Sequence, residues 1–249
     1  MMHKPIQAHR GYSDLYPENT MLAFREAVRA GAGGIEMDIR RTADHQFVII
    51  HDPTVNRTTN GTGRVAELDY GSYLQHLDAG GWKGPAYANR ADTRIPNLQQ
   101  VLDEFQNSSI TFILHLKQED SLDVLNIIRQ RNVLGQVVFF GNEAVINPIK
   151  KAEAGAYTQN DGAPGPDRYE AVLRNAIEYG HNAVSISSET VTGEMVAEIK
   201  RYDKFEHVSF LSGDYEASAE RLMALNVNYM LGNDPRRMIG GLGRKGNAE

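Results

Sequence analysis

Ionisable side chains occur in pairs at four places where short β-rich runs of the sequence end. The pairs are His9-Arg10, Glu36-x-Asp38, His51-Asp52 and His115-x-Lys117. Residues two apart on a strand point to the same face, so Glu36 and Asp38 can both reach one hard cation. Imidazoles that titrate near neutral pH can take a proton from one reacting oxygen and give one to another. The pairs therefore suit metal-assisted acid–base chemistry.

Each pair also has an ordinary structural explanation. Glu36 and Asp38 could pair with Arg40 and Arg41, which follow them in the sequence. His115 could be a core histidine whose hydrogen bonds are satisfied, and the other histidines could belong to a surface pair or a turn. Burying two carboxylates without a cation is costly, however, and four convergent pairs are harder to explain by chance than one.

The elements that position these pairs alternate between β-rich runs and segments of helical period. Strand candidates are Ile6 to Ala8, Gly34 to Asp38, Phe47 to Ile50, Thr111 to Leu116, Val137 to Phe140, Ala156 to Thr158, Ala183 to Ser185, His207 to Phe210 and Tyr229 to Leu231. This alternation predicts parallel strands with helical crossovers, and a chain of 249 residues suits one α/β barrel. In such a barrel the carboxyl ends of the strands share one rim, where barrel enzymes hold their sites.

Three features depart from a regular barrel. There are nine strand candidates where eight are needed, and Ala156 to Thr158 is the weakest of them. Ile39 to Gln46 is too short for a helical crossover between the second and third candidates. Residues 52–94 are rich in Gly, Thr, Asn and Tyr and contain the only tryptophan, Trp82. We predict one domain over residues 1–249, with residues 52–94 inserted as a lid or binding loop after the third strand.

Composition excludes several classes of protein. The chain has no cysteine, which rules out a thiolate nucleophile or a thiolate metal site. A formal charge of -6 argues against nucleic acid as a partner. The apolar runs are far shorter than the roughly 20 residues of a membrane span, and we see no secretory signal, so we expect no membrane insertion and a cytoplasmic location. The oligomeric state is left open.

The order and spacing of motifs over residues 6–105 resemble the glycerophosphodiester phosphodiesterase family. The motifs are His9-Arg10-Gly11, Pro17-Glu18-Asn19-Thr20, Ile35-Glu36-x-Asp38, Thr42-x-Asp44, Val48-x-x-His51-Asp52, Arg57-Thr58-Thr59-Asn60-Gly61-Thr62-Gly63, Leu77-Asp78-Ala79-Gly80 and Ile95-Pro96. So many linked matches are far more specific than a single glycine-rich motif.

The resemblance implies a distorted (β/α)8 TIM barrel related to phosphatidylinositol phospholipases C, and a phosphoric diester hydrolase that uses one divalent cation, Mg²⁺, Mn²⁺ or Ca²⁺. By the same resemblance, His9 and His51 are the general acid and base, and Arg10 and Lys117 bind phosphate. The resemblance also implies that the enzyme releases a phosphomonoester and an alcohol from glycerophosphocholine or another lipid-derived diester. Such an enzyme belongs to lipid metabolism. Attack by water and attack by the neighbouring glycerol hydroxyl are both compatible with these residues.

One residue departs from the family pattern. Where the family has Glu-x-Lys on the fourth strand, this chain has His115-Leu116-Lys117. We predict that Glu36, Asp38 and His115 bind the metal, and an imidazole ligand favours Mn²⁺ or Zn²⁺. In the alternative, His115 contacts a metal ligand or the substrate, and water or Glu119 completes the coordination.

The resemblance fades after the fourth strand, so the chemistry is expected to persist while the choice of alcohol changes. Gln159-Asn160-Asp161 could contact the hydroxyls of a sugar phosphodiester of the opine (agrocinopine) kind. A catalytically silent relative that binds a phosphodiester is the second alternative, because the third carboxylate is missing.

Overall fold

The computed structural model describes residues 5–118, 120–161 and 166–243, and eight of its strands form a closed parallel ring. The ring strands are β1 (Ile6–Ala8), β2 (Gly34–Arg41), β4 (Thr111–Leu116), β5 (Val137–Gly141), β6 (Tyr157–Asn160), β7 (Ala183–Ser187), β8 (Phe205–Ser209) and β9 (Tyr229–Gly232). Their order is β1-β9-β8-β7-β6-β5-β4-β2, and pairing of β1 with β2 closes the ring.

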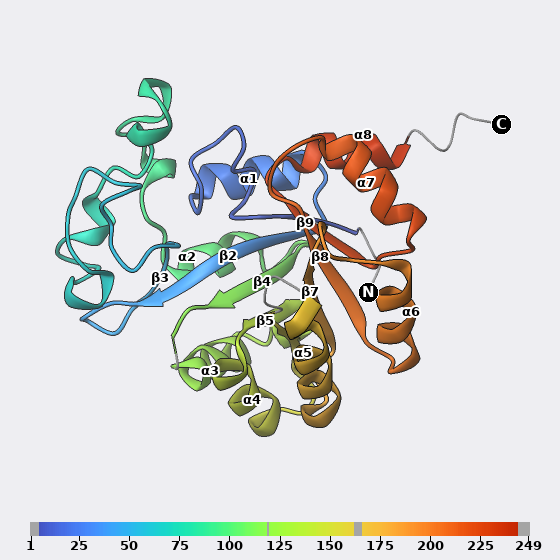
Figure 1. Cartoon of the computed structure of the whole chain (residues 1–249). Coiled ribbons are helices and arrows are strands. Elements are labelled where there is room, and N and C mark those ends of the chain that lie inside the picture. Colours follow the sequence, from blue (N-terminus) through green and yellow to red (C-terminus); the bar gives the residue numbers. More distant parts are fainter. Residues whose placement is uncertain (1–4, 119, 162–165, 244–249) are drawn as a thin grey trace.

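Helices follow the strands and cover the outside of the ring (Figure 1). They are α1 (Met21–Arg29), α2 (Leu98–Phe105), α3 (Ser121–Gln130), α4 (Glu143–Ala152), α5 (Pro166–Tyr179), α6 (Gly193–Arg201), α7 (Tyr215–Ala224) and α8 (Pro235–Gly243). The predicted (β/α)8 barrel is therefore confirmed. No helix of the described ranges combines the length and the apolar character needed to span a membrane.

The extra strand is β3 (Phe47–Ile49), which lies outside the ring and pairs antiparallel with β2. The short connection after β2 is a hairpin turn, in which the Thr42 amide donates to the Gln46 carbonyl at 2.9 Å. Antiparallel strands need only such a turn, whereas parallel strands need a crossover. We ranked Ala156 to Thr158 as the weakest strand candidate, and that ranking was wrong. The segment runs into β6, which is one of the ring strands.

Alternate residues of each strand face opposite sides of the barrel wall. Ile35 and Met37 of β2 and Leu114 of β4 pack with helix residues such as Leu102 in one buried cluster between strands and helices. A second cluster joins the later strands to α5, α6, α7 and α8. The residues between these apolar positions, Glu36 among them, face the barrel axis, so the outer packing directs the polar residues inward.

Residues 52–94 form turns and five short 3-10 helices beside β2 and β3, at one side of the barrel (Figure 1). These helices are η1 (Val65–Glu67), η2 (Leu74–His76), η3 (Gly81–Lys83), η4 (Pro85–Tyr87) and η5 (Ala91–Thr93); η6 (Leu134–Gln136) precedes β5. The inserted segment has a small core of its own, to which Val55 and Leu74 contribute fully buried side chains. Burial of this kind gives the segment a defined shape without regular secondary structure.

Candidate active site

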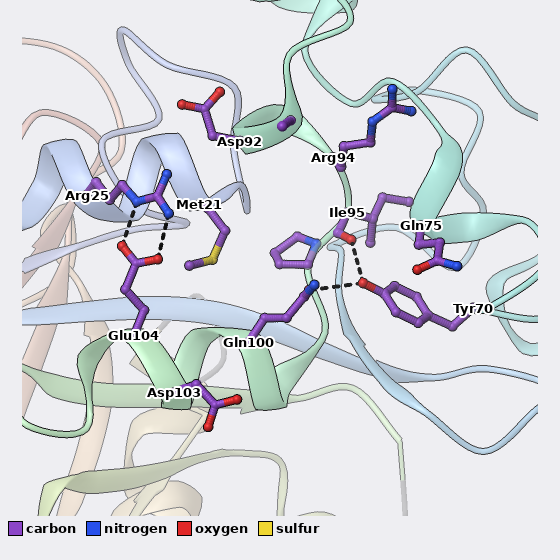
Figure 2. Close-up of a pocket in the computed structure, with 12 residues that line it drawn as sticks. Met21, Arg25, Tyr70, Gln75, Asp92, Arg94, Ile95, Gln100, Asp103 and Glu104 are labelled. Carbon is purple, nitrogen blue, oxygen red and sulfur yellow. Dashed lines mark hydrogen bonds and ion pairs between the residues drawn. The ribbon is translucent and has the colours of Figure 1, made fainter.

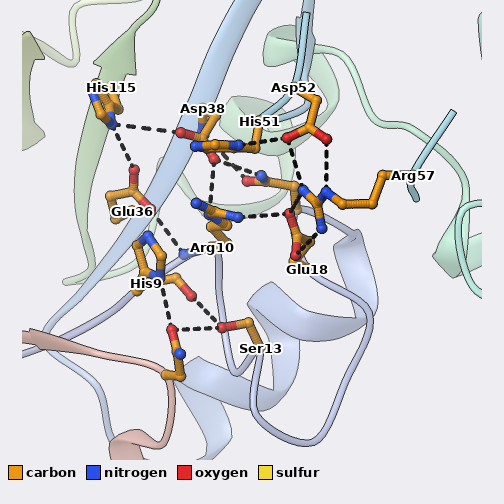
Figure 3. A network of polar contacts seen from close by, with 12 residues as sticks. His9, Arg10, Ser13, Glu18, Glu36, Asp38, His51, Asp52, Arg57 and His115 are labelled. Carbon is orange, nitrogen blue, oxygen red and sulfur yellow. Dashed lines mark hydrogen bonds and ion pairs between the residues drawn. The ribbon is translucent and has the colours of Figure 1, made fainter. Parts of the chain in front are cut away.

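The predicted site residues meet at the rim formed by the carboxyl ends of the ring strands (Figure 3). His9 and Arg10 come directly after β1, and Glu36 and Asp38 lie in β2. His115 is in β4, opposite Asp38 in the strand register. In the view of Figure 3, Glu36, Asp38 and Arg10 lie between His9 and His51.

Glu36, Asp38 and His115 offer ligand atoms that all lie within 4.8 Å of one another. His115 Nδ1 is 3.5 Å from Glu36 Oε1 and 3.5 Å from Asp38 Oδ1. Both carboxylates are fully buried, and Glu36 Oε1 accepts no hydrogen bond from the residues that the structure describes. Two buried carboxylate oxygens that converge on an imidazole nitrogen are a donor set that fits a divalent cation.

The other oxygen of each carboxylate is held by the loop between β1 and α1. The Arg10 backbone amide donates to Glu36 Oε2 at 2.9 Å, and the Asn19 side-chain amide donates to Asp38 Oδ2 at 2.8 Å. Thr20 caps α1, and its hydroxyl accepts from the Ala23 amide. Asn19 is thereby left to orient a carboxylate at the site.

Two cationic side chains lie against Asp38. Lys117 Nζ is 2.9 Å from Asp38 Oδ1 and 2.8 Å from His115 Nδ1, and Arg10 Nε is 3.4 Å from Asp38 Oδ2. Burial alone would raise the pKa of Asp38, but Lys117, His115 and Arg10 together lower it. Burial lowers the pKa of His115, but Asp161 and Glu36 raise it overall. The Asp38 carboxylate is therefore negatively charged at neutral pH, and Lys117 and Arg10 balance that charge.

His9 is oriented by an amide. Its Nδ1 lies 2.7 Å from Asn233 Oδ1, and the Asn233 side-chain nitrogen donates to the Leu211 carbonyl at 2.7 Å. Because that second bond directs the amide oxygen at the ring, Nδ1 carries the proton and Nε2 is the basic nitrogen. Burial lowers the pKa of His9. At neutral pH the ring is an uncharged base.

His51 reaches the rim by a route other than the predicted one. We expected it at the end of a parallel strand, but β3 runs antiparallel to β2 and brings the chain back to the level of Asp38, whose carbonyl accepts from the Ile50 amide at 2.9 Å. The His51 ring lies 2.7 Å from Asp52 Oδ1. Hydrogen bonds from Arg57 lower the pKa of Asp52 to about 2.

The ordinary explanation of the acidic pair fails in this geometry. Arg40 donates to the His51 carbonyl at 2.9 and 2.7 Å, and Arg41 pairs with Asp120 at 3.1 Å. Arg41 lies on the opposite face of β2 from Glu36 and Asp38. Arg40 lies on their face, but its guanidinium is held by the His51 carbonyl. Glu119 lies outside the described residues.

The sequence of residues 9–142, more than half of the chain, matches the profile of the glycerophosphoryl diester phosphodiesterase family. The chain belongs to this family. A glycerophosphodiester phosphodiesterase from Caldanaerobacter subterraneus is 46% identical over 98 residues, which are 39% of this chain and 39% of that protein. The matches span about half of the length of the curated relatives, or less.

Solved structures of glycerophosphodiester phosphodiesterases share the fold over nearly the whole chain. The enzyme from Agrobacterium tumefaciens superposes with a TM-score of 0.83 at 24% identity, covering 96% of this chain and 100% of that one. A phosphodiesterase from Oleispira antarctica was solved in complex with the product sn-glycerol-3-phosphate. It has a TM-score of 0.82 at 23% identity, and the match covers 96% of this chain and 97% of that one. These likenesses establish the barrel architecture.

In this glycerophosphoryl diester phosphodiesterase family member, a cavity of about 300 Å³ lies beside His9 and Glu36 at the barrel mouth. Its wall is formed by residues from the later strands and the loops after them, where the sequence resemblance fades. These include Ser185, Ser187, Ser209, Leu211 and Leu231. Gln159-Asn160-Asp161, which we expected to contact sugar hydroxyls, has one residue at this cavity. Gln159 and Asn160 are 1% exposed, and only Asp161 lines the cavity.

A larger cavity of about 750 Å³ lies elsewhere, between α1, α2 and the end of the inserted segment (Figure 2). Arg25 and Glu104 pair across it at 2.5 Å, and the Tyr70 hydroxyl is hydrogen-bonded to Gln100 at 3.0 Å. None of the predicted site residues lines it. Two other acidic residues of the lining are paired with arginines outside it, Asp92 with Arg90 and Asp103 with Arg131, so we place no chemistry there.

Sequence reasoning missed the residues that orient the site. Asn233 and His9 are 224 positions apart in the chain, and the serines of the cavity wall carry no motif. Glu18, Asn19 and Arg57 lie inside motifs that carried the family resemblance, so they could have been proposed as site residues. Their partners are visible only in the folded chain.

Proposed function

We propose that this chain is a metal-dependent phosphodiesterase that hydrolyses glycerophosphodiesters, or a related small phosphodiester, to a phosphomonoester and an alcohol. The observation that carries the proposal is the convergence of Glu36, Asp38 and His115 beside Arg10 and His9 at one rim. The product bound to the Oleispira relative is a phosphomonoester of glycerol, which agrees with this substrate class.

In the proposed reaction His9 is the general base. Its Nε2 accepts the proton of the attacking hydroxyl, from water or from the neighbouring hydroxyl of the substrate, as the new P–O bond forms. The lowered pKa and the uncharged Asn233 partner suit this role. His51 is then the general acid, which donates a proton to the leaving oxygen as the old P–O bond breaks. The two proton transfers balance, and the alcohol leaves neutral. When water attacks, this step gives the phosphomonoester directly. When the neighbouring hydroxyl attacks, it gives a cyclic phosphate, which water then opens as His51 accepts the proton of the water and His9 returns its proton to the ring oxygen.

Glu36, Asp38 and His115 would hold one divalent cation, and a bound cation would polarise a phosphoryl oxygen and offset the charge that develops on it. Arg10 and Lys117 would bind the remaining phosphoryl oxygens. Both now contact Asp38, so a phosphate that enters the rim would compete for them with that carboxylate. An imidazole in the ligand set favours Mn²⁺ or Zn²⁺ over Ca²⁺.

The alcohol side of the substrate would occupy the cavity beside His9. Ser185 and Ser209 present hydroxyls there from adjacent strands, and hydroxyls both donate and accept hydrogen bonds. This wall suits glycerol or a sugar, in agreement with an agrocinopine-like substrate as a second candidate. Residues 52–94 would act as the lid beside the rim, because Lys83 and Tyr87 donate to backbone carbonyls of the loop after β1.

The test is a matrix of substrates and metals. Purified protein stripped of metal is assayed on glycerophosphocholine, glycerophosphoglycerol, a p-nitrophenyl phosphodiester and sugar phosphodiesters, each with Mg²⁺, Mn²⁺, Ca²⁺ or Zn²⁺ and with chelator. We expect release of alcohol that depends on the ion and stops with chelator. Ligand binding without turnover under every ion would replace this proposal with a silent phosphodiester-binding protein.

A further inference from the structure

Arg57, in the inserted segment, contacts two carboxylates with one guanidinium. Its Nε and Nη2 lie 2.7 and 3.0 Å from the two oxygens of Asp52, and its Nη1 and Nη2 lie 3.1 and 2.8 Å from the two oxygens of Glu18. The side chain is 43% exposed, but Asp52 and Glu18 are less exposed, at 24% and 11%. Networks with bidentate geometry are the surface ion pairs that contribute measurably.

Each of these carboxylates touches a different part of the rim. Asp52 Oδ1 lies 2.7 Å from His51 Nδ1, whereas Glu18 Oε1 accepts from Arg10 Nη1 at 2.9 Å. His51, Asp52, Arg57, Glu18 and Arg10 thus form one continuous chain of contacts (Figure 3). Within this series of contacts between described residues, Arg57 joins the proton-transferring side to the phosphate-binding side.

Charge explains why the link must be an arginine. Asp52 and Glu18 are both acidic, and hydrogen bonds from Arg57 keep the pKa of each below its usual range, in Glu18 against the effect of burial. Without a cation between them the two carboxylates would repel each other. A lysine supplies the charge but not a planar fork that can bind both carboxylates bidentately.

Arg10 needs such external support. Its φ is 53°, in the left-handed region that residues other than glycine rarely adopt. The backbone amide is committed to Glu36, so the direction of the guanidinium depends on its side-chain contacts. Glu18 supplies the shortest of these, at 2.9 Å against 3.4 Å for Asp38.

The inserted segment holds Arg57 in place. The Thr59 amide and hydroxyl both donate to the Val55 carbonyl, at 3.1 and 2.8 Å, and the Gly63 amide donates to Asn56 Oδ1 at 2.9 Å. Val55 is fully buried in the core of the segment. The turn that carries Arg57 is therefore anchored on both sides of the residue.

We propose that Arg57 is a positioning residue that couples the orientation of His51, through Asp52, to that of Arg10, through Glu18. The inference rests on the proposed phosphodiesterase function. It assigns the inserted segment a task besides covering the rim: the segment completes the alignment of the two halves of the site.

The test compares Arg57→Met and Arg57→Lys with Arg64→Met as the matched control. Arg64 lies in the same segment and forms one exposed ion pair, to Glu67 at 3.5 Å. We expect Arg57→Met to lower kcat/KM on glycerophosphocholine, whose alkoxide leaving group needs a proton, about 100-fold, the cost of a misplaced catalytic group. We expect Arg57→Lys to lose about tenfold, since it keeps the charge, and Arg64→Met to stay within about twofold. Equal effects of Arg57→Met and Arg64→Met would overturn the proposal.

Two further variants separate positioning from general destabilisation. Glu18→Gln should weaken the binding of inorganic phosphate about tenfold, the value of a hydrogen bond between charged groups, while Asp52→Asn should lower kcat and leave phosphate binding unchanged. Arg57→Met should both weaken phosphate binding and lower kcat. In a double mutant with Arg57→Met, Glu18→Gln or Asp52→Asn should cause a smaller additional loss than it causes in the wild-type chain. Additive losses in both double mutants would refute coupling through Arg57.

The phosphate measurement keeps the two proposals distinguishable. If the wild-type chain hydrolyses no phosphodiester, the proposed function fails, but isothermal titration with inorganic phosphate still reports on Arg10. In that case unchanged phosphate affinity in Arg57→Met would overturn the positioning role. If Arg57→Met does not fold, phosphate affinity and kcat/KM are measured in Arg57→Lys instead. Wild-type values of both quantities in Arg57→Lys would then overturn the positioning role of Arg57.

Discussion

At the scale of single residues, the two histidines of the rim differ in what holds them. His9 faces the amide oxygen of Asn233 and His51 faces the carboxylate of Asp52. We expect His9→Ala and His51→Ala to lower kcat about 100- to 10,000-fold on substrates with alkoxide leaving groups. With p-nitrophenolate, which leaves without protonation, His51→Ala should recover much of the loss and His9→Ala should not.

The control for these variants is His76→Ala, since His76 is an exposed residue of η2 and should leave kcat unchanged. The assay is steady-state hydrolysis of paired diesters that share one arm. Equal recovery of both variants with p-nitrophenolate would show that the acid and base roles are assigned wrongly.

The proposed role of His115 as a metal ligand leads to a second prediction for a single residue. Isothermal titration of the metal-free protein with Mn²⁺ and Zn²⁺ should show at least about tenfold weaker binding in His115→Ala, because one of three ligands is lost. His115→Glu should bind Mg²⁺ and Ca²⁺ more tightly than the wild type does, since a third carboxylate suits hard cations. Unchanged affinity and selectivity in both variants would remove His115 from the ligand set.

At the scale of elements, the inserted segment depends on its own small core. Leu74 is fully buried there, so Leu74→Ala should lower the free energy of unfolding by about 2–5 kcal/mol in urea titration. Leu122→Ala on α3, where the side chain is 44% exposed, is the control and should cost less than about 0.5 kcal/mol. A similar cost for both would mean that the segment does not rely on this core.

The elements could be predicted in kind but not in every placement. Helical period and β-rich runs located the strands of the ring, and residues two apart in β2 were correctly expected on one face. The pairing of β3 was not predictable from its own composition, because an apolar run of this length reads alike in parallel and antiparallel strands. β6 was undervalued for a different reason: two of its four residues, Gln159 and Asn160, are polar amides, so its composition gives a weak strand signal.

At the scale of the whole molecule, two buried histidines away from the rim connect stability to pH. Burial, with Lys150 and Lys204 nearby, lowers the pKa of His181 to about 4, and burial lowers that of His207 to about 3. The unfolded chain binds protons on these rings below about pH 6.5, whereas the folded chain does not until lower pH. The free energy of unfolding should therefore fall as the pH drops from about 6.5 to 4.

The expected slope is up to about 1.4 kcal/mol per pH unit for each histidine. Urea titrations at pH 7, 6, 5 and 4 measure it, with His181→Gln as the comparison. The Gln variant should show a shallower loss over this window, since one titrating ring is gone. A free energy of unfolding that stays constant from pH 7 to 4 would contradict the prediction.

Period and spacing are properties of neighbouring residues, so the sequence was enough to predict the barrel and the residues gathered at its rim. Only the tertiary structure decided which strand stands outside the ring, that an amide 224 positions away orients His9, and that Arg57 joins Asp52 to Glu18 across 39 positions. Those contacts depend on closure of the barrel and docking of the inserted segment. They follow from packing of the whole chain and not from local preference.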